Sequence, residues 1–107
     1  MNILTVCSGG NCRSVALAML LKLFHKQKDV LAMGIDYTSD KTRNMLFKWA
    51  DQIIVVGEVE LKDKVKKKTN KPVAHFDVGP DIWNNPFDRN LLFKLNAMLI
   101  EAWGQKK

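Results

Sequence analysis

Several features are scarce or missing in this chain of 107 residues. It has only two cysteines, and its start, MNILTVCSGG, lacks the basic leader and cleavage site of a signal peptide. No apolar run approaches the roughly 20 residues that a transmembrane helix needs. Composition gives no sign of disorder, because hydrophobic residues make up 47% and charged residues 26%. We therefore expect one domain over residues 1–107, in a cytoplasmic, reducing setting that keeps thiols available for chemistry.

Acidic residues are also few: 11 against 17 basic residues give a net charge of +6. A basic protein attracts anions, such as phosphorylated substrates, nucleic acid or a membrane surface. Lysines crowd one segment of the chain: Lys62, Lys64, Lys66, Lys67, Lys68 and Lys71. Because this segment has no aromatic residues that could stack on bases, it indicates a solvated helix face and loop. We expect neither a nucleic-acid partner nor a membrane partner.

Short apolar runs alternate with longer helical stretches along the chain. Strands are expected at residues 3–6, 29–35, 52–57 and 73–76, and helices at 14–28, 41–50, 58–69 and 89–103. Plausible caps for the second helix are Thr38, Ser39 and Asp40. Residues 77–88 contain two of the three prolines and are expected to form a loop. The alternation predicts an α/β fold, a single three-layer domain with a four-stranded parallel sheet and helices on both faces.

The segment CSGGNCRS follows the first expected strand and opens the first expected helix, at the sheet edge where parallel α/β sheets bind ligands. A glycine-containing loop at a helix N-terminus can bind phosphate through its backbone N–H groups. The phosphate-binding residues would be Ser8, Gly9, Gly10, Asn11, Cys12 and Arg13. Arg13 adds a permanently charged fork that can bind two phosphate oxygens. The alternative, buried cysteines beside an ordinary turn, does not account for this combination of strand, glycines, helix and arginine.

Cys7 is the candidate nucleophile. A helix N-terminus and Arg13 both favour its thiolate, which can attack phosphorus and form a phosphocysteine. Ser14 could hydrogen-bond the sulfur and later help it leave. An acid must protonate the departing oxygen, and a base must then activate water. Three aspartates of the expected loop are candidates for this acid and base: Asp77, Asp81 and Asp88.

The motif and its surroundings resemble the low-molecular-weight protein tyrosine phosphatases, especially the short members of that family. The loop residues that match in register are Val6, Cys7, Gly9, Cys12, Arg13 and Ser14. Residues 49–56 (WADQIIVV) resemble a strand of the family, and residues 76–83 (FDVGPDIW) resemble its acid loop. The resemblance covers most of the chain.

The resemblance implies a role for each matching residue. Cys7 would be the nucleophile, Arg13 would bind phosphate and the transition state, and Ser14 would stabilise the thiolate. Cys12 would form a reversible disulfide with Cys7 that protects the nucleophile from overoxidation. Trp83 would line the substrate entrance, and packing within the loop is its alternative role.

The resemblance also assigns the general acid and base to Asp81. Here the chain departs from the family pattern, because Ile82 follows Asp81 where the family has proline. Asp77 therefore remains an alternative acid, and Asp88 is a more distant one. Asn11 also lies one place later than the asparagine of the family. The region between the second strand and the second helix is shorter, which leaves tyrosine specificity open.

These residues predict a cysteine-dependent phosphatase that hydrolyses phosphate monoesters, and the resemblance implies phosphotyrosine as the leading substrate. Its partners would be a phosphorylated protein or a small aryl phosphate, and inorganic phosphate or sulfate would bind in the loop. No cofactor is expected, and no metal, because the cysteine and histidine spacings do not fit a zinc site. A catalytically degenerate domain that only binds phosphate or phosphoproteins is the main alternative. A thiol-dependent arsenate reductase would need further cysteines, and a phosphocysteine carrier would lack Arg13.

Overall fold

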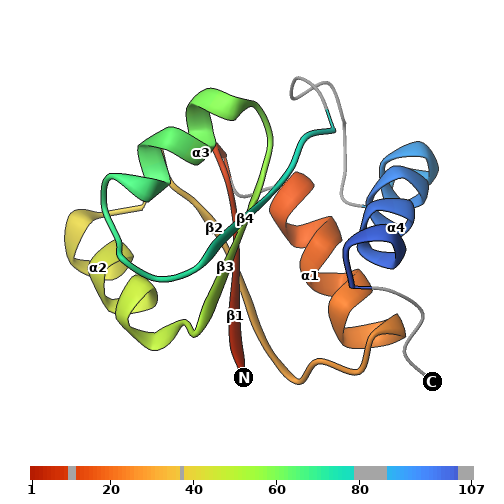
Figure 1. Ribbon diagram of the computed structural model, residues 1–107, viewed down its shortest axis with the longest axis horizontal. Helices are drawn as coiled ribbons and strands as arrows, with labels where there is room; N and C mark the ends of the chain where they lie inside the picture. Colours follow the sequence, from red (N-terminus) through yellow and green to blue (C-terminus); the bar gives the residue numbers. More distant parts are fainter. Residues whose placement is uncertain (10–11, 37, 79–86, 104–107) are drawn as a thin grey trace.

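The computed structural model describes residues 1–9, 12–36, 38–78 and 87–103 (Figure 1). The strands are β1 (Asn2–Cys7), β2 (Asp29–Gly34), β3 (Gln52–Val56) and β4 (Val73–Phe76). The helices are α1 (Arg13–Phe24), α2 (Asp40–Trp49), α3 (Val59–Lys66) and α4 (Arg89–Trp103). The predicted alternation of strands and helices is confirmed in this order.

The strands form one parallel sheet in the order β2-β1-β3-β4. β1 is central and pairs with β2 from Asn2 opposite Asp29 to Cys7 opposite Gly34. Helices α1 and α4 cover one face of the sheet, and α2 and α3 cover the other (Figure 1). The predicted three-layer α/β domain with a four-stranded parallel sheet is therefore confirmed.

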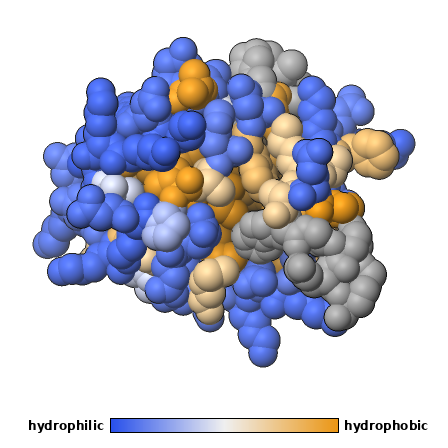
Figure 2. All heavy atoms as spheres, in the orientation of Figure 1, coloured by the Kyte–Doolittle hydropathy of each residue, from blue (hydrophilic) through white to orange (hydrophobic). Residues whose placement is uncertain are grey.

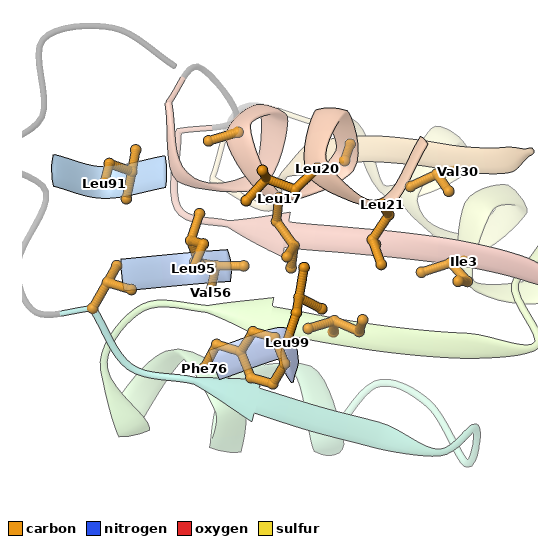
Figure 3. Close-up of a cluster of buried hydrophobic side chains, with 14 residues drawn as sticks. Ile3, Leu17, Leu20, Leu21, Val30, Val56, Phe76, Leu91, Leu95 and Leu99 are labelled. Carbon is orange, nitrogen blue, oxygen red and sulfur yellow. The ribbon is translucent and has the colours of Figure 1, made fainter. Parts of the chain in front are cut away.

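Each face of the sheet has its own hydrophobic core, because neighbouring residues of a strand point to opposite faces. Ile3 of β1 packs beneath α1 and α4, whereas Leu4 packs beneath α2 and α3. In Figure 3, leucines of α1 and α4 lie over the strands, with Leu95 beside Val56 and Leu99 beside Phe76. Strands buried on both faces are apolar along nearly their whole length, which explains why β1 and β3 were recognisable in the sequence.

Two helices end several residues before their expected ends. Helix α1 ends at Phe24, four residues before the expected end at 28, because Lys26 has a left-handed φ of 57° that no α-helix continues through. Helix α3 ends at Lys66 rather than at Thr69, and the next two residues form a turn. Most of the expected loop, residues 79–86, lies outside the described residues.

Hydrophilic side chains gather over α2 and α3 (Figure 2). Most of the lysines of the basic segment are exposed there, and Lys64 Nζ donates to Asp36 Oδ1 at 2.7 Å. The segment thus has the solvated helix face that its composition indicated, with Lys64 paired to Asp36. Within the described ranges, no helix is both long enough and apolar enough to cross a membrane.

Candidate functional site

The candidate site lies at the edge of the sheet where the parallel strands end (Figure 1). Cys7 is the last residue of β1, and Arg13 is the first residue of α1. The predicted loop therefore joins the central strand to the helix packed on it. Of the predicted loop residues, Gly10 and Asn11 lie outside the described residues.

Cys7 is buried, and its thiol donates to Ser14 Oγ at 3.1 Å. If the thiol loses its proton, the same distance allows the Ser14 hydroxyl to donate to the sulfur instead. The backbone carbonyls of Cys7 and Ser8 are held by the chain after β2. The carbonyl of Cys7 accepts from Ile35 N–H at 2.9 Å, and that of Ser8 accepts from Asp36 N–H at 3.0 Å. The sulfur and its hydroxyl partner are therefore on rigid elements.

Arg13 is almost completely buried, with 1% of its side chain exposed. Its Nη2 donates to Ser8 Oγ at 3.0 Å, and its Nη1 donates to Glu58 Oε1 at 3.2 Å. A buried guanidinium needs such partners, because an uncompensated charge in the interior is strongly destabilising. The structure thus brings Arg13 together with Ser8, another residue of the predicted phosphate-binding loop.

Thr5 anchors α1 beneath the loop. This fully buried residue of β1 donates through Oγ1 to the carbonyl of Ser14 at 2.7 Å. The bond ties the first turn of α1 to the central strand and so fixes the helix that carries Arg13. Thr5 was not among the predicted site residues. The signal for it was a single polar residue within the apolar run Ile3–Val6.

The turn between β3 and α3 supplies two further residues that sequence reasoning missed, Gly57 and Glu58. Gly57 has a φ of 152°, and a Cβ atom there would lie 2.9 Å from Arg13 Nη1, so only glycine fits without displacement. Its carbonyl lies 2.6 Å from His75 Nε2 of β4. The available signal was a Gly-Glu pair directly after a buried strand, at the edge where β1 also ends.

Glu58 has a pKa below the usual value for glutamate. The largest cause is a hydrogen bond from its own backbone N–H, which stabilises the carboxylate. Partial burial opposes this effect, while the hydrogen bond and the positive charge of Arg13 add to the lowering. The nearby carboxylate of Asp77 acts in the opposite direction. Glu58 is therefore ionised at neutral pH and pairs with Arg13 as a carboxylate.

The candidate acids differ in position. Asp77 is exposed, directly follows β4, and is close enough to Glu58 to affect its pKa, which puts Asp77 at the same sheet edge. Asp88 instead caps α4, because its Oδ1 accepts from the N–H groups of Asn90 at 2.9 Å and Leu91 at 3.2 Å. The assignment of the acid to Asp81 remains a prediction, since that residue lies outside the described residues.

The remaining predicted residues are the other cysteine, one glycine and the entrance aromatic. Cys12 is half-buried in the N-cap position of α1, and its carbonyl accepts from Ala16 N–H at 2.8 Å. Cys12 and Cys7 are not joined in a disulfide. Gly9 is half-buried beside them, and Trp83 lies outside the described residues. The redox pairing of the cysteines stays a prediction.

An apolar hollow of about 380 Å³ lies between α1 and α4, away from the loop. Its lining consists of Leu20, Phe24, Phe87, Arg89, Leu92, Phe93 and Asn96. Among the residues that the structure describes, none of the predicted site residues contributes to this lining. The candidate site is thus defined by the polar contacts around Cys7 and Arg13 and not by this hollow.

A comparison with protein-family models, with curated proteins and with solved structures gives no match. The fold and the site define this protein as an α/β domain with a cysteine and a buried arginine at the carboxyl edge of its central strand. What such a site can do follows from its chemistry alone: bind an anion and present a sulfur nucleophile to it.

Proposed function

We propose that this chain is a cysteine-dependent phosphatase that hydrolyses phosphate monoesters through a phosphocysteine. One observation carries the proposal: the Cys7 sulfur, its hydroxyl partner Ser14 and the buried fork of Arg13 share one strand–loop–helix connection. Phosphorylated proteins, with phosphotyrosine as the leading group, and small aryl phosphates are the proposed substrates. A cytoplasmic setting suits this chemistry because the thiol must stay reduced.

The reaction has two displacements at phosphorus. In the first, the Cys7 thiolate forms a bond to phosphorus while the bond to the leaving oxygen breaks, and Asp81 or Asp77 protonates that oxygen. In the second, the same aspartate takes a proton from water, the new oxygen bonds to phosphorus, and the sulfur leaves. Arg13 stabilises the charged oxygens in both steps, and the Ser14 hydroxyl donates to the departing sulfur.

A phosphate-binding domain without catalysis is the second candidate. It is favoured by the departure of the expected acid loop from the family pattern, because Ile82 follows Asp81 where the family has proline. Such a domain would bind inorganic phosphate or sulfate in the loop without hydrolysing an ester.

Hydrolysis of a generic aryl phosphate by purified variants tests the proposal. Cys7→Ser should abolish turnover, and Arg13→Ala should lower kcat/KM by roughly 10²–10³-fold. Because Arg13 is buried, thermal unfolding of Arg13→Ala and Arg13→Lys must show that these variants fold. Lys22→Ala removes an exposed basic residue from the same helix as Arg13 and is the matched control, which should keep its activity.

The acid is identified by comparing Asp81→Asn with Asp77→Asn. The true acid should lose roughly 10²–10⁴-fold in turnover, and the other aspartate should lose little. Unchanged phosphate release by Cys7→Ser would rule out the phosphocysteine mechanism. Mass spectrometry of rapidly quenched protein provides the remaining distinction. A phosphocysteine that forms and never hydrolyses indicates a carrier, and phosphate binding without any adduct or turnover indicates the binding domain.

A further inference from the structure

Arg13 is held from two sides by groups far apart in the chain. Ser8, in its own loop, accepts from Nη2, and Glu58, which is 45 positions along the chain, accepts from Nη1. An arginine fork binds two phosphate oxygens well only when its plane faces them. Contacts on two different nitrogens restrain that plane more than a contact on one nitrogen would.

The Glu58 contact comes from a rigid support. Glu58 is the N-cap residue of α3, and its carbonyl accepts from Leu61 N–H at 3.0 Å in the first turn of that helix. The preceding residue, Gly57, donates through its backbone N–H to the carbonyl of Phe76 at 3.0 Å. The carbonyl of Gly57 is in turn contacted by the imidazole of His75. The backbone that carries the Glu58 carboxylate is therefore held by contacts with both α3 and β4 at the end of β3.

The fit between this support and the arginine is close. Gly57 leaves no room for a Cβ atom beside Arg13 Nη1, so the turn passes directly against the guanidinium. Glu58 is 45% exposed, in contrast to the 1% of Arg13. The carboxylate that pairs with the buried guanidinium is therefore itself held at the protein surface, where it can compensate the charge of Arg13 and also restrain its orientation.

We propose that Glu58 is a positioning residue that holds the Arg13 guanidinium in the orientation that binds the phosphoryl group. This role rests on the proposed phosphate site, and it assigns to the β3–α3 turn a part in catalysis without contact to substrate. Glu58 acts through Arg13, and the first effect of its loss would be on how well the site binds and stabilises a phosphoryl anion.

Steady-state hydrolysis of an aryl phosphate and competitive inhibition by inorganic phosphate measure this role. Glu58→Ala should lower kcat/KM by about tenfold and weaken phosphate inhibition by several-fold, because a misoriented fork loses contacts to the anion. Glu58→Gln keeps an acceptor oxygen and should recover most of the loss. Glu60→Gln removes an exposed carboxylate from the same helical turn and is the matched control, with wild-type kinetics expected.

The separate effects on kcat, KM and the phosphate inhibition constant distinguish a positioning role from a loss of stability. A variant that merely unfolds in part would lose kcat in proportion to its inactive fraction, with KM and the phosphate inhibition constant unchanged. That result would overturn the proposal, as would kinetics equal to those of Glu60→Gln. Tighter phosphate binding by Glu58→Ala would also overturn it, because Glu58 would then be a competitor for Arg13.

Failure of the proposed function gives a different pattern. If wild type binds inorganic phosphate without turnover, hydrolysis is excluded, and the Glu58 role is decided by calorimetric phosphate affinity of the same variants. The positioning role then predicts several-fold weaker binding by Glu58→Ala and wild-type binding by Glu60→Gln. If wild type binds no phosphate at all, both proposals are overturned.

Discussion

Arg13 carries a permanent charge at a point where almost none of its surface reaches water. Removing an ion from water costs several kcal/mol, and this cost is offset only where hydrogen bonds and an opposite charge are in place. Ser8 provides a hydroxyl acceptor and Glu58 provides a carboxylate. At the scale of single residues, the same two contacts make the burial of Arg13 tolerable and keep its fork oriented.

The lowered pKa of Glu58 makes part of the stability dependent on pH. The carboxylate contributes fully above the unfolded-state pKa of glutamate, about 4.3, and this contribution is lost as pH falls through the lower folded-state pKa. Glu58→Gln should reduce the free energy of unfolding at pH 7 by no more than about 1 kcal/mol, since water screens the half-exposed pair. Urea unfolding should show this difference in free energy between wild type and Glu58→Gln at pH 7 and a smaller difference near pH 3. Equal differences at the two pH values would contradict the prediction.

Helix α2 shows how neighbouring residues with similar propensities take different roles in one element. Of the three plausible caps, Ser39 is the N-cap, and its Oγ accepts from Thr42 N–H at 3.2 Å. Thr38 donates through Oγ1 to the carbonyl of Gly34 at 2.6 Å, which joins the helix start to the end of β2. Asp40 begins the helix and pairs with Arg43 at 2.9 Å.

Ser39→Ala should destabilise the protein by about 1 kcal/mol, because an N–H group of the first turn loses its acceptor. Turnover of an aryl phosphate by the folded variant should not change, since α2 contributes no residue to the candidate site in the described part of the chain. The control is Ser39→Asp, which keeps a capping oxygen and should unfold close to wild type in urea. Equal destabilisation by both substitutions would show that the cap is not the cause.

For the molecule as a whole, stability depends on two cores that share one sheet. The core beneath α1 and α4 supports the helix that carries Arg13, and α4 contributes Leu91, Leu95 and Leu99, all fully buried. Substitutions in the buried face of α4 should therefore weaken the support of α1 and of the loop before it. Substitutions in the exposed face of α4 should have little effect.

Leu95→Ala should reduce the free energy of unfolding by about 2–5 kcal/mol, because it leaves a cavity in a close-packed core. Phe93→Ala, on the same helix, is the matched control: its side chain is 79% exposed, and its change should stay within about 0.5 kcal/mol. Thermal or urea unfolding of both variants is the measurement. Similar losses for the two would mean that α4 packs on the sheet through a different face.

Much of the fold could be predicted because its signals are local. Apolar runs marked β1 and β3, the periodicity of Leu91, Leu95 and Leu99 marked α4, and the strand–helix alternation indicated a parallel sheet. Cys7 and Arg13 were equally accessible to prediction, since they are six positions apart and flank a single loop. Helix ends were less accessible, because the stop of α1 depends on the backbone conformation of Lys26 rather than on a breaker residue.

The sequence by itself determined the order of the strands and helices and their positions to within a few residues, and which loop carries the cysteine and the arginine. Only the tertiary structure decided the strand order β2-β1-β3-β4, and with it the neighbours of that loop. Because β3 lies beside β1, Gly57 and Glu58 meet Arg13 across a long stretch of chain. Side-chain periodicity specifies the faces of a strand but not its neighbours in the sheet, which depend on packing among all the elements.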